Sequence, residues 1–516
     1  MSSTATKHRP SNVTSALARD RLGVPSVIFF VLSAAAPLAV VAGLITTAYA
    51  VTGITGIPVA FLAIGAVLLL FSVGYVAMAR RVANAGAFYA YISRGIGRPA
   101  GVAGAWVALI AYNLLQVGLY GVVGAAAEPV LHRWFGIEVH WWLVALATWA
   151  IVAVLGLLRV DINGKVLAFL LLSEIAVILV FDVADLFHPA GGQVSFDTLA
   201  PGNLLLPGIG ALLVIAVLGF TGFESAVVFS EESKDPQRTV SMATYLSVAI
   251  VAGVYAFSSW AMTVATGPDQ IVTAAGEQEV GLIFNLAGAH MGSTVVDIGQ
   301  ALFLTSLLAA MISFHNTTAR YAFALGRERV LPAVLGRTSP RTGAPRYGSI
   351  AQSTLGLFVI LLYAIAGWDP LERLFYWGGT SGGLGVLLLI AVTSIAVVRF
   401  FVQHPSDEHI WRRTIAPMLA AGLLIVIVVV ALINVPTLLG VAPEHPLRWI
   451  VPGAYVVAAL LGVSWALVLR STRPDVYQTI GMGAESVTAR TATDPAEVPA
   501  QRAAETGASV DLGAGR

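Results

Sequence analysis

The chain has 516 residues, of which 57% are hydrophobic and only 11% are charged, and its mean hydropathy is +0.82. A soluble domain carries about 25% charged residues, so this composition excludes a soluble protein and indicates an integral membrane protein. The net charge of +1 argues against a nucleic-acid partner, and the lack of cysteine excludes disulfides, thiolate metal sites and cysteine nucleophiles.

Residues 1–21 are polar and lack a signal peptide's apolar core, so we expect a cytoplasmic tail followed by a retained first span. Apolar stretches long enough to cross about 30 Å of hydrocarbon then follow. We expect twelve of them, near residues 24–50, 57–79, 99–125, 141–158, 164–187, 206–232, 240–266, 294–325, 347–366, 374–399, 414–435 and 449–470. Because these runs are continuous rather than alternating, they exclude a strand barrel and predict an all-α membrane protein.

Lysine and arginine gather in alternate connections between these spans. The expected external loops hold only Arg133, Arg373 and Arg448, which are three of the 29 basic residues. Cytoplasmic loops carry the excess of basic residues, so we expect a multi-pass protein of the cell membrane with both termini in the cytoplasm. Residues 471–516 are rich in Ala, Thr, Glu and Gly without an apolar period, which predicts a disordered cytoplasmic tail.

Two spans are interrupted where a membrane helix is usually most apolar. The first contains Ser33-Ala34-Ala35-Ala36-Pro37-Leu38, and the sixth contains Gly219-Phe220-Thr221-Gly222-Phe223-Glu224. These are corresponding positions if residues 22–187 and 206–399 form two five-span repeats, followed by two further helices at 414–470. Paired broken helices in inverted repeats indicate the midplane site of a secondary transporter. The alternative is that Pro37 only kinks an ordinary membrane helix.

Three motifs resemble one family. Gly219–Glu224, followed by Glu231-Glu232 and Asp235-Pro236-Gln237-Arg238, is similar to the sixth-span signature of the amino acid–polyamine–organocation permeases. Residues 80–89 resemble that family's loop after the second span, and residues 321–332 resemble its loop after the eighth. The resemblance covers about residues 22–470. It implies twelve helices in a leucine-transporter-like five-plus-five inverted repeat with helices one and six broken, and coupled uptake or exchange of amino acids or related amines.

An amino acid needs backbone N–H groups for its carboxylate and carbonyl oxygens for its ammonium, and opened helices offer both. The predicted substrate-binding residues are Ser33, Ala34, Ala35, Ala36, Pro37, Gly219, Phe220, Thr221, Gly222, Asn113 and Phe314. Asn113 alternatively makes a helix–helix hydrogen bond. The aromatic residues Phe220, Phe314 and Trp377 serve either as gates beside the ligand or only as packing. The alanines of the first break stand where the resembling family usually has glycines.

Three residues are candidates for coupling or gating: Glu224, Glu174 and Trp377. Glu224 either titrates and couples proton movement to a gate, or stays ionised and braces the opened backbone. Glu174 lies near the position where proton-coupled relatives carry a lysine, so that role does not transfer. It is a proton site, a cation ligand or a partner for a polar residue of another span. Glu231 and Glu232 are expected to form surface ion pairs with basic loops.

We therefore predict a secondary active transporter that moves amino acids or related amines by alternating access. A proton is favoured over sodium as the coupling ion, and a neutral amino acid is favoured as the substrate. The alternatives are an importer or exchanger of cationic amino acids or polyamines, and, in a different class, a channel or sensor. A membrane enzyme is disfavoured because no paired His/Asp cluster or HExxH motif occurs. No cofactor, metal or catalytic residue is expected.

Overall fold

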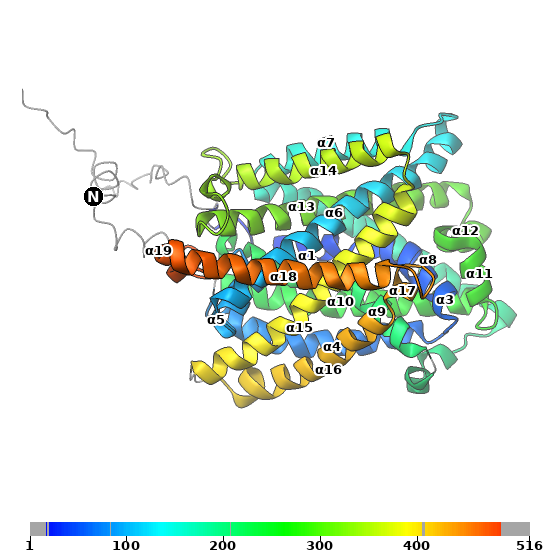
Figure 1. Ribbon diagram of the computed structural model, residues 1–516. Helices are drawn as coiled ribbons and strands as arrows, with labels where there is room; N and C mark the ends of the chain where they lie inside the picture. The colour runs from blue at the N-terminus through cyan, green and yellow to red at the C-terminus, as the bar shows by residue number, and fades with distance from the viewer. Residues whose placement is uncertain (1–16, 18–19, 83, 207, 405–407, 487–516) are drawn as a thin grey trace, which may run out of the picture.

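The computed structural model describes residues 17, 20–82, 84–206, 208–404 and 408–486. These residues form helices joined by turns, and their strand-like pairing is limited to one isolated bridge between Leu22 and Ser233. The helices lie side by side in one bundle (Figure 1). The predicted all-α membrane class is therefore confirmed.

Within the described chain, eleven helical stretches are long and apolar enough to cross a membrane. They are Val24–Thr52 (α1 to α3), Ile57–Ala79 (α4), Arg98–Phe135 (α6), Val160–Phe187 (α8), Ile209–Glu232 (α9 and a 3₁₀ helix), Pro236–Thr266 (α10), Ser293–Arg327 (α13), Arg346–Ala366 (α14), Pro370–Gln403 (a π-helix and α15), Trp411–Ile433 (a π-helix and α16) and Leu447–Thr472 (α18). The expected fourth span is the 17-residue helix α7 (Trp141–Leu157). At 1.5 Å per residue α7 is about 26 Å long. The count of twelve stays a prediction that depends on α7.

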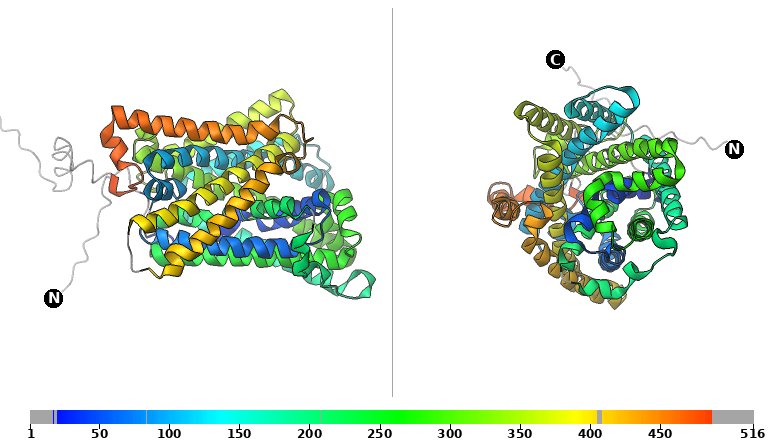
Figure 2. Two further views of the ribbon diagram at one scale, coloured as in Figure 1. Left: turned by 60° about the horizontal axis from the view of Figure 1, so that its bottom comes forward. Right: turned by 90° about the vertical axis from the view of Figure 1, so that its right-hand side faces the viewer.

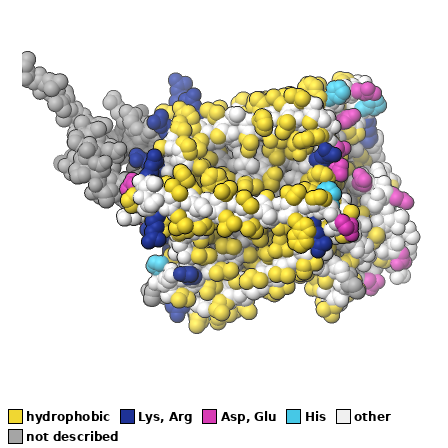
Figure 3. Space-filling model, in the orientation of Figure 1, with side chains coloured by type: hydrophobic (Ala, Val, Ile, Leu, Met, Phe, Trp, Pro, Cys, Tyr) yellow, Lys and Arg dark blue, Asp and Glu magenta, His cyan; other side chains and the backbone are white. Residues whose placement is uncertain are grey.

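Shorter helices cap the two ends of the bundle. They are α5 (Phe88–Gly95), α11 (Ile271–Gln278), α12 (Leu282–Met291), α17 (Val435–Leu438) and α19 (Pro474–Thr479). Lysine and arginine side chains gather at the end that carries α5 and α19, whereas most acidic side chains gather at the other end (Figure 3). We call these the basic end and the acidic end.

The long helix α6 lies in the interior and packs against α5, α13, α15 and α18. Glycines permit the close contact with α15, because a Cβ at Gly382 would lie 2.7 Å from the backbone oxygen of Ala111. Small residues are the usual means by which membrane helices approach closely. The view along the bundle shows helices surrounding this interior (Figure 2, right).

The chain after α18 differs from the expected disordered tail. Residues 474–479 form α19, and the following turn packs on the basic end, where Val476 and Ile480 are each 2% exposed. Apolar side chains at these two positions give the segment something to bury, which the overall composition of residues 471–516 concealed. The rest of the predicted tail, 487–516, and residues 1–16 lie outside the described residues.

Candidate functional site

The first break lies where the sequence predicts it. Helix α1 (Val24–Ala35) ends before Ala36, whose backbone is left-handed at φ 45° and ψ 66°, and α2 (Pro37–Ala39) begins directly afterwards. The interruption frees backbone groups that need partners in a membrane interior. The Tyr255 hydroxyl donates to the Ala35 carbonyl over 2.9 Å, and the Leu38 N–H donates to the Glu174 carboxylate. Side chains of α10 and α8 therefore hold this break open.

The second break follows α9 (Ile209–Gly219). Gly222 adopts φ 116°, and the chain continues as a 3₁₀ helix over Phe223–Glu232. Only glycine enters this backbone region without a steric penalty. The Gly222 N–H donates to Oε2 of Glu224 over 2.9 Å, and the Tyr75 hydroxyl donates to the Glu224 carbonyl over 2.9 Å. Glu224, which belongs to this break, therefore accepts the hydrogen bonds that stabilise it.

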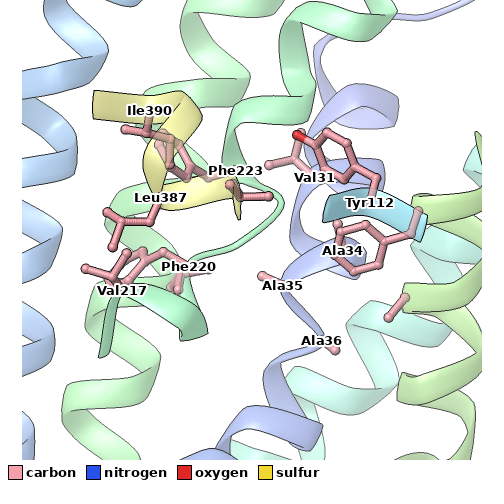
Figure 4. Packing of buried hydrophobic residues seen from close by; sticks show 14 of the residues in the cluster. Val31, Ala34, Ala35, Ala36, Tyr112, Val217, Phe220, Phe223, Leu387 and Ile390 are labelled. Atoms are coloured by element: carbon pink, nitrogen blue, oxygen red, sulfur yellow. The ribbon is translucent and has the colours of Figure 1, made fainter. Parts of the chain in front are cut away.

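The two breaks face each other across the interior of the bundle. Figure 4 shows Ala34, Ala35 and Ala36 of the first opposite Phe220 and Phe223 of the second. A Cβ at Gly222 would lie 2.5 Å from the Cβ of Ala34, so the two backbones meet here only because position 222 is glycine. The two interruptions are therefore in contact in the structure, and their use as one substrate site stays a prediction.

Two buried carboxylates contact the breaks. Glu224 accepts hydrogen bonds from the Tyr112 hydroxyl (2.7 Å) and the Gly222 N–H, and it is 1% exposed. Glu174 is fully buried and accepts from the Ser306 hydroxyl (2.6 Å) and the Leu38 N–H, while its Oε2 atom has no hydrogen-bond partner. All these donors are uncharged. Glu174 thus occupies one of the backbone donors that the first break frees.

A cavity of about 500 Å³ begins at the breaks. Its walls include Ala34, Leu218, Thr221, Phe314 and Phe375. It continues to the acidic end, where the lining residues Arg133, Glu279 and Thr437 are exposed to solvent. Small-molecule sites usually measure about 300–1,000 Å³, so the cavity has room for an amino acid.

Ion pairs close the opposite, basic end. Arg320 donates to both carboxylate oxygens of Glu232, and both side chains are 1% exposed. Arg327 pairs with Glu231 at 2.6 Å. The N–H groups of Arg21 and Leu22 both donate to the Glu232 carbonyl. The expectation of surface pairs is therefore wrong for Glu232, because α13 supplies a buried partner from a distant part of the chain. We call these two ion pairs the basic seal.

The predicted site residues divide into two groups. Ala34, Ala35, Ala36, Thr221 and Phe314 line the cavity. Four of the other predicted residues lie in the breaks: Ser33, whose hydroxyl has no hydrogen-bond partner, Pro37, Gly219 and Gly222. The remaining three pack elsewhere: Phe220 lies between Phe61 and Tyr255, Asn113 bonds to the Leu109 carbonyl of its own helix, and Trp377 lies beside His445. Their roles in binding or gating stay predictions.

Sequence reasoning missed the three tyrosines Tyr75, Tyr112 and Tyr255, which hold the breaks, and also Phe375 in the cavity wall. One available signal was that a buried tyrosine usually needs a partner for its hydroxyl group. The partners themselves come from other helices, so the one-dimensional pattern does not reveal them.

The comparisons with known proteins agree with this geometry. A family model described as amino acid permease matches residues 22–458. The chain belongs to the amino acid permease family. This permease is 25% identical over 393 residues to a probable GABA permease of Pseudomonas aeruginosa, covering 73% of this chain and 78% of that protein.

Two further relatives carry different substrates in their names. A low-affinity putrescine importer of Escherichia coli is 24% identical, covering 60% of this chain and 68% of the importer. A branched-chain amino acid permease of Bacillus subtilis is 23% identical, covering 57% and 56% of the two chains. The protein is thus a multi-pass membrane transporter of amino acids or related amines, rather than an enzyme.

Proposed function

We propose that this permease accumulates a neutral amino acid by proton-coupled alternating access. The observation that carries the proposal is the cavity that starts at two facing helix breaks and reaches solvent at only the acidic end, among the described residues. A transporter of this type binds its substrate near the midplane and exposes it to one side at a time. The basic seal provides the closed side in this conformation.

The orientation in the membrane follows from charge. We infer that the basic end faces the cytoplasm of the cell, because cytoplasmic loops of membrane proteins carry the excess of lysine and arginine. The protein then lies in the plasma membrane with both termini inside. The conformation described is open to the outside and closed to the inside.

A neutral substrate is supported by the cavity walls. Within the cavity, the side chains of Leu218, Ile215, Phe314 and Phe375 offer hydrocarbon and no charge. A cationic side chain buried there would lose its hydration without gaining a carboxylate partner from the wall. The substrate's own carboxylate and ammonium are expected to contact the backbone of the breaks.

Glu224 and Glu174 support a proton as the coupled ion. Each is buried, each contacts one break, and each accepts hydrogen bonds only from uncharged donors. An uncompensated charge in a membrane interior is unfavourable, so gain or loss of a proton would change the hold of each carboxylate on its break. Substrate binding and proton binding then both depend on the backbone groups of the two breaks, which couples them.

The decisive experiment is uptake by proteoliposomes under an imposed proton gradient. Glu224→Gln keeps the shape of the side chain, and we expect it to abolish proton-driven accumulation while leaving substrate exchange measurable. Glu138→Gln, an exposed acid at the acidic end, is the matched control and should behave as the native protein. Accumulation and pH dependence that are unchanged in Glu224→Gln would refute the coupling role.

A second candidate substrate class is a cationic amino acid or polyamine. The two buried carboxylates next to the breaks favour it, and one relative is named as a putrescine importer. A thermal-shift screen of the purified protein separates the classes, because a bound ligand stabilises the folded state. We expect leucine-sized neutral amino acids to raise the melting temperature and putrescine to leave it unchanged; the reverse result favours the polyamine. Flux that never saturates would instead indicate a channel.

A further inference from the structure

The chain folds back over the basic end after its last long helix. Helix α18 ends at Thr472, α19 turns across the bundle, and residues 480–486 continue beside α5 (Figure 2, left). Ile480 is 2% exposed and Ser486 is fully buried. The side chains of a tail extended into solvent would be exposed, so their burial shows that the segment 474–486 is docked on the protein.

One carboxylate fixes the docked segment. Glu328, which follows α13, is fully buried and accepts hydrogen bonds from the N–H groups of Gly481 (2.6 Å) and Gly483 (2.7 Å). Its other donors are the Tyr89 hydroxyl of α5 and the Asn84 amide (3.2 Å). Gly481 and Gly483 have φ of 79° and 63°, which turns successive N–H groups toward the anion as in other backbone anion sites. Glu328 therefore ties the C-terminal segment to α5.

Arginines of α5 and α6 add contacts along the same segment. Arg94 donates to the Gly481 carbonyl (3.2 Å) and pairs with Glu485 at 3.7 Å. Arg98 donates to the Gln478 carbonyl (3.0 Å) and lies over the ring of Tyr477. These contacts point to one docking position.

Helix α5 in turn connects to the basic seal. The N–H of Ala85, just before α5, donates to Glu231 (3.0 Å), which pairs with Arg327. The N–H of Phe88 donates to the Tyr321 hydroxyl of α13 (3.2 Å). Opening the basic end therefore requires that α5 and its flanking residues move relative to α13.

We propose that residues 474–486 form a C-terminal clamp, which holds α5 on the basic seal while it is docked on Glu328. The basic end then opens readily only after the clamp leaves. This inference rests on the proposed alternating access. It adds a control element that lies outside the substrate pathway. The element is held by hydrogen bonds from two glycine N–H groups to Glu328 of the same chain.

The natural absence of cysteine allows single reporter cysteines without background labelling. Ser486→Cys reports docking of the clamp, and Ser230→Cys, at a 2% exposed position next to the basic seal, reports opening of that end. Thr47→Cys in the cavity reports the opposite end. Each is labelled with a water-soluble maleimide in purified protein, and Ala484→Cys, which is exposed, gives the unprotected rate.

Gly481→Ala releases the clamp in this design. Its new Cβ would lie 2.7 Å from the Cβ of Ser93 at a positive φ, whereas Gly453→Ala, in α18 with open space around it, is the matched control. Glu328→Gln tests the same contact from the other side. With the clamp intact, we expect Ser486→Cys and Ser230→Cys to react much more slowly than Ala484→Cys. In Gly481→Ala and Glu328→Gln, both should react severalfold faster, while Thr47→Cys slows.

Each remaining outcome has a defined meaning. Ser486→Cys reacting as fast as Ala484→Cys in the otherwise native chain would show that the segment is not docked. Faster labelling at Ser486 in both variants with an unchanged rate at Ser230 would show that docking does not control the basic end, and would overturn the proposal. Both readouts need no substrate, so they separate a failure of the clamp from a failure of the proposed transport, which uptake measures independently.

Discussion

The two ends of this permease carry the same kinds of charged residue in opposite environments, buried at one end and exposed at the other. At the basic end, Arg320 and Glu232 are desolvated and paired, whereas at the acidic end Arg133 and Glu279 stand exposed beside the cavity. Desolvation consumes much of the attraction within a buried ion pair, and its members regain hydration when water enters. A closure made of ion pairs can therefore reopen more easily than one made only of hydrocarbon. We infer from this comparison that buried ion pairs give the basic end a closure that can reopen.

The largest test of this contrast removes one member of the buried pair. Arg320→Ala leaves Glu232 buried without its partner, and we expect a loss of about 3–5 kcal/mol in the free energy of unfolding. Arg133→Ala at the acidic end, whose partner Asp297 is partly exposed, should cost no more than about 1 kcal/mol. Denaturant unfolding of the purified proteins measures both values.

A paired replacement sharpens the same point. Arg320→Met combined with Glu232→Leu removes both charges, so we expect most of the lost stability to return, as it does when other buried pairs are replaced by hydrocarbon. Transport should nevertheless fall, because an apolar seal no longer gains hydration on opening. A double variant that transports normally would show that the ion pair is not what makes the basic end reversible.

The next prediction concerns Gly222, where the two breaks are in contact. Gly222→Ala places a Cβ 2.5 Å from that of Ala34 at φ 116°, and we expect an overpacking cost of about 1–3 kcal/mol together with loss of transport. Gly253→Ala, inside α10 with nothing within 4 Å, is the control and should stabilise by up to about 1 kcal/mol. Thermal unfolding and uptake are measured on the same preparations. Normal uptake by Gly222→Ala would show that the close contact of the breaks is dispensable.

Tyr112→Phe tests the charge of Glu224 at the second break. It removes the hydroxyl that donates to Glu224, and a hydrogen bond to a charged group contributes about 1.5–3 kcal/mol. Tyr255→Phe removes a bond to a neutral carbonyl, worth about 0.5–1.5 kcal/mol. The difference between the two variants in unfolding free energy tests whether Glu224 is ionised: equal losses would indicate a neutral carboxyl at the second break.

The smallest prediction returns to the basic end and concerns pH. Burial raises the pKa of Glu328 above its ordinary value of 4.5, although hydrogen bonds from Tyr89 and the glycines, and the charge of Arg327, act in the opposite direction. The folded state therefore binds more protons at Glu328 than the unfolded chain does. Its protonation-linked stability is fully present below pH 4.5 and is lost as the pH rises through the raised pKa. The contribution of Glu328 to the free energy of unfolding should accordingly decrease with increasing pH, which denaturant unfolding of the native protein and Glu328→Gln at each pH measures.

Local chemistry made much of the fold predictable. Long apolar runs gave the positions of the spans, and Pro37, Gly219 and Gly222 marked the breaks because their effects on the backbone do not depend on distant residues. The helix α7 shows the limit, since length alone leaves its status as a span undecided.

Side-chain positions around the site were less predictable. Membrane helices are apolar on all sides, so the sequence pattern does not show which face of a helix meets the cavity. Asn113 and Trp377 were candidates by residue type, yet Phe375, two residues before Trp377, lines the cavity instead. Glu232 looked like a surface acid because its partner, Arg320, lies 88 residues away. Such pairings depend on tertiary structure.

The hydrocarbon wall formed by Leu218, Ile215, Phe314 and Phe375 also limits how finely this permease can choose. These four side chains carry no hydrogen-bonding group, so they discriminate by size, and one methylene is worth about 1–3 kcal/mol, or roughly 10- to 200-fold. Valine, leucine and isoleucine should therefore compete for uptake with graded rather than absolute preference. In a mixed nutrient supply, the relative abundance of these molecules would determine what enters the cell as much as the protein itself.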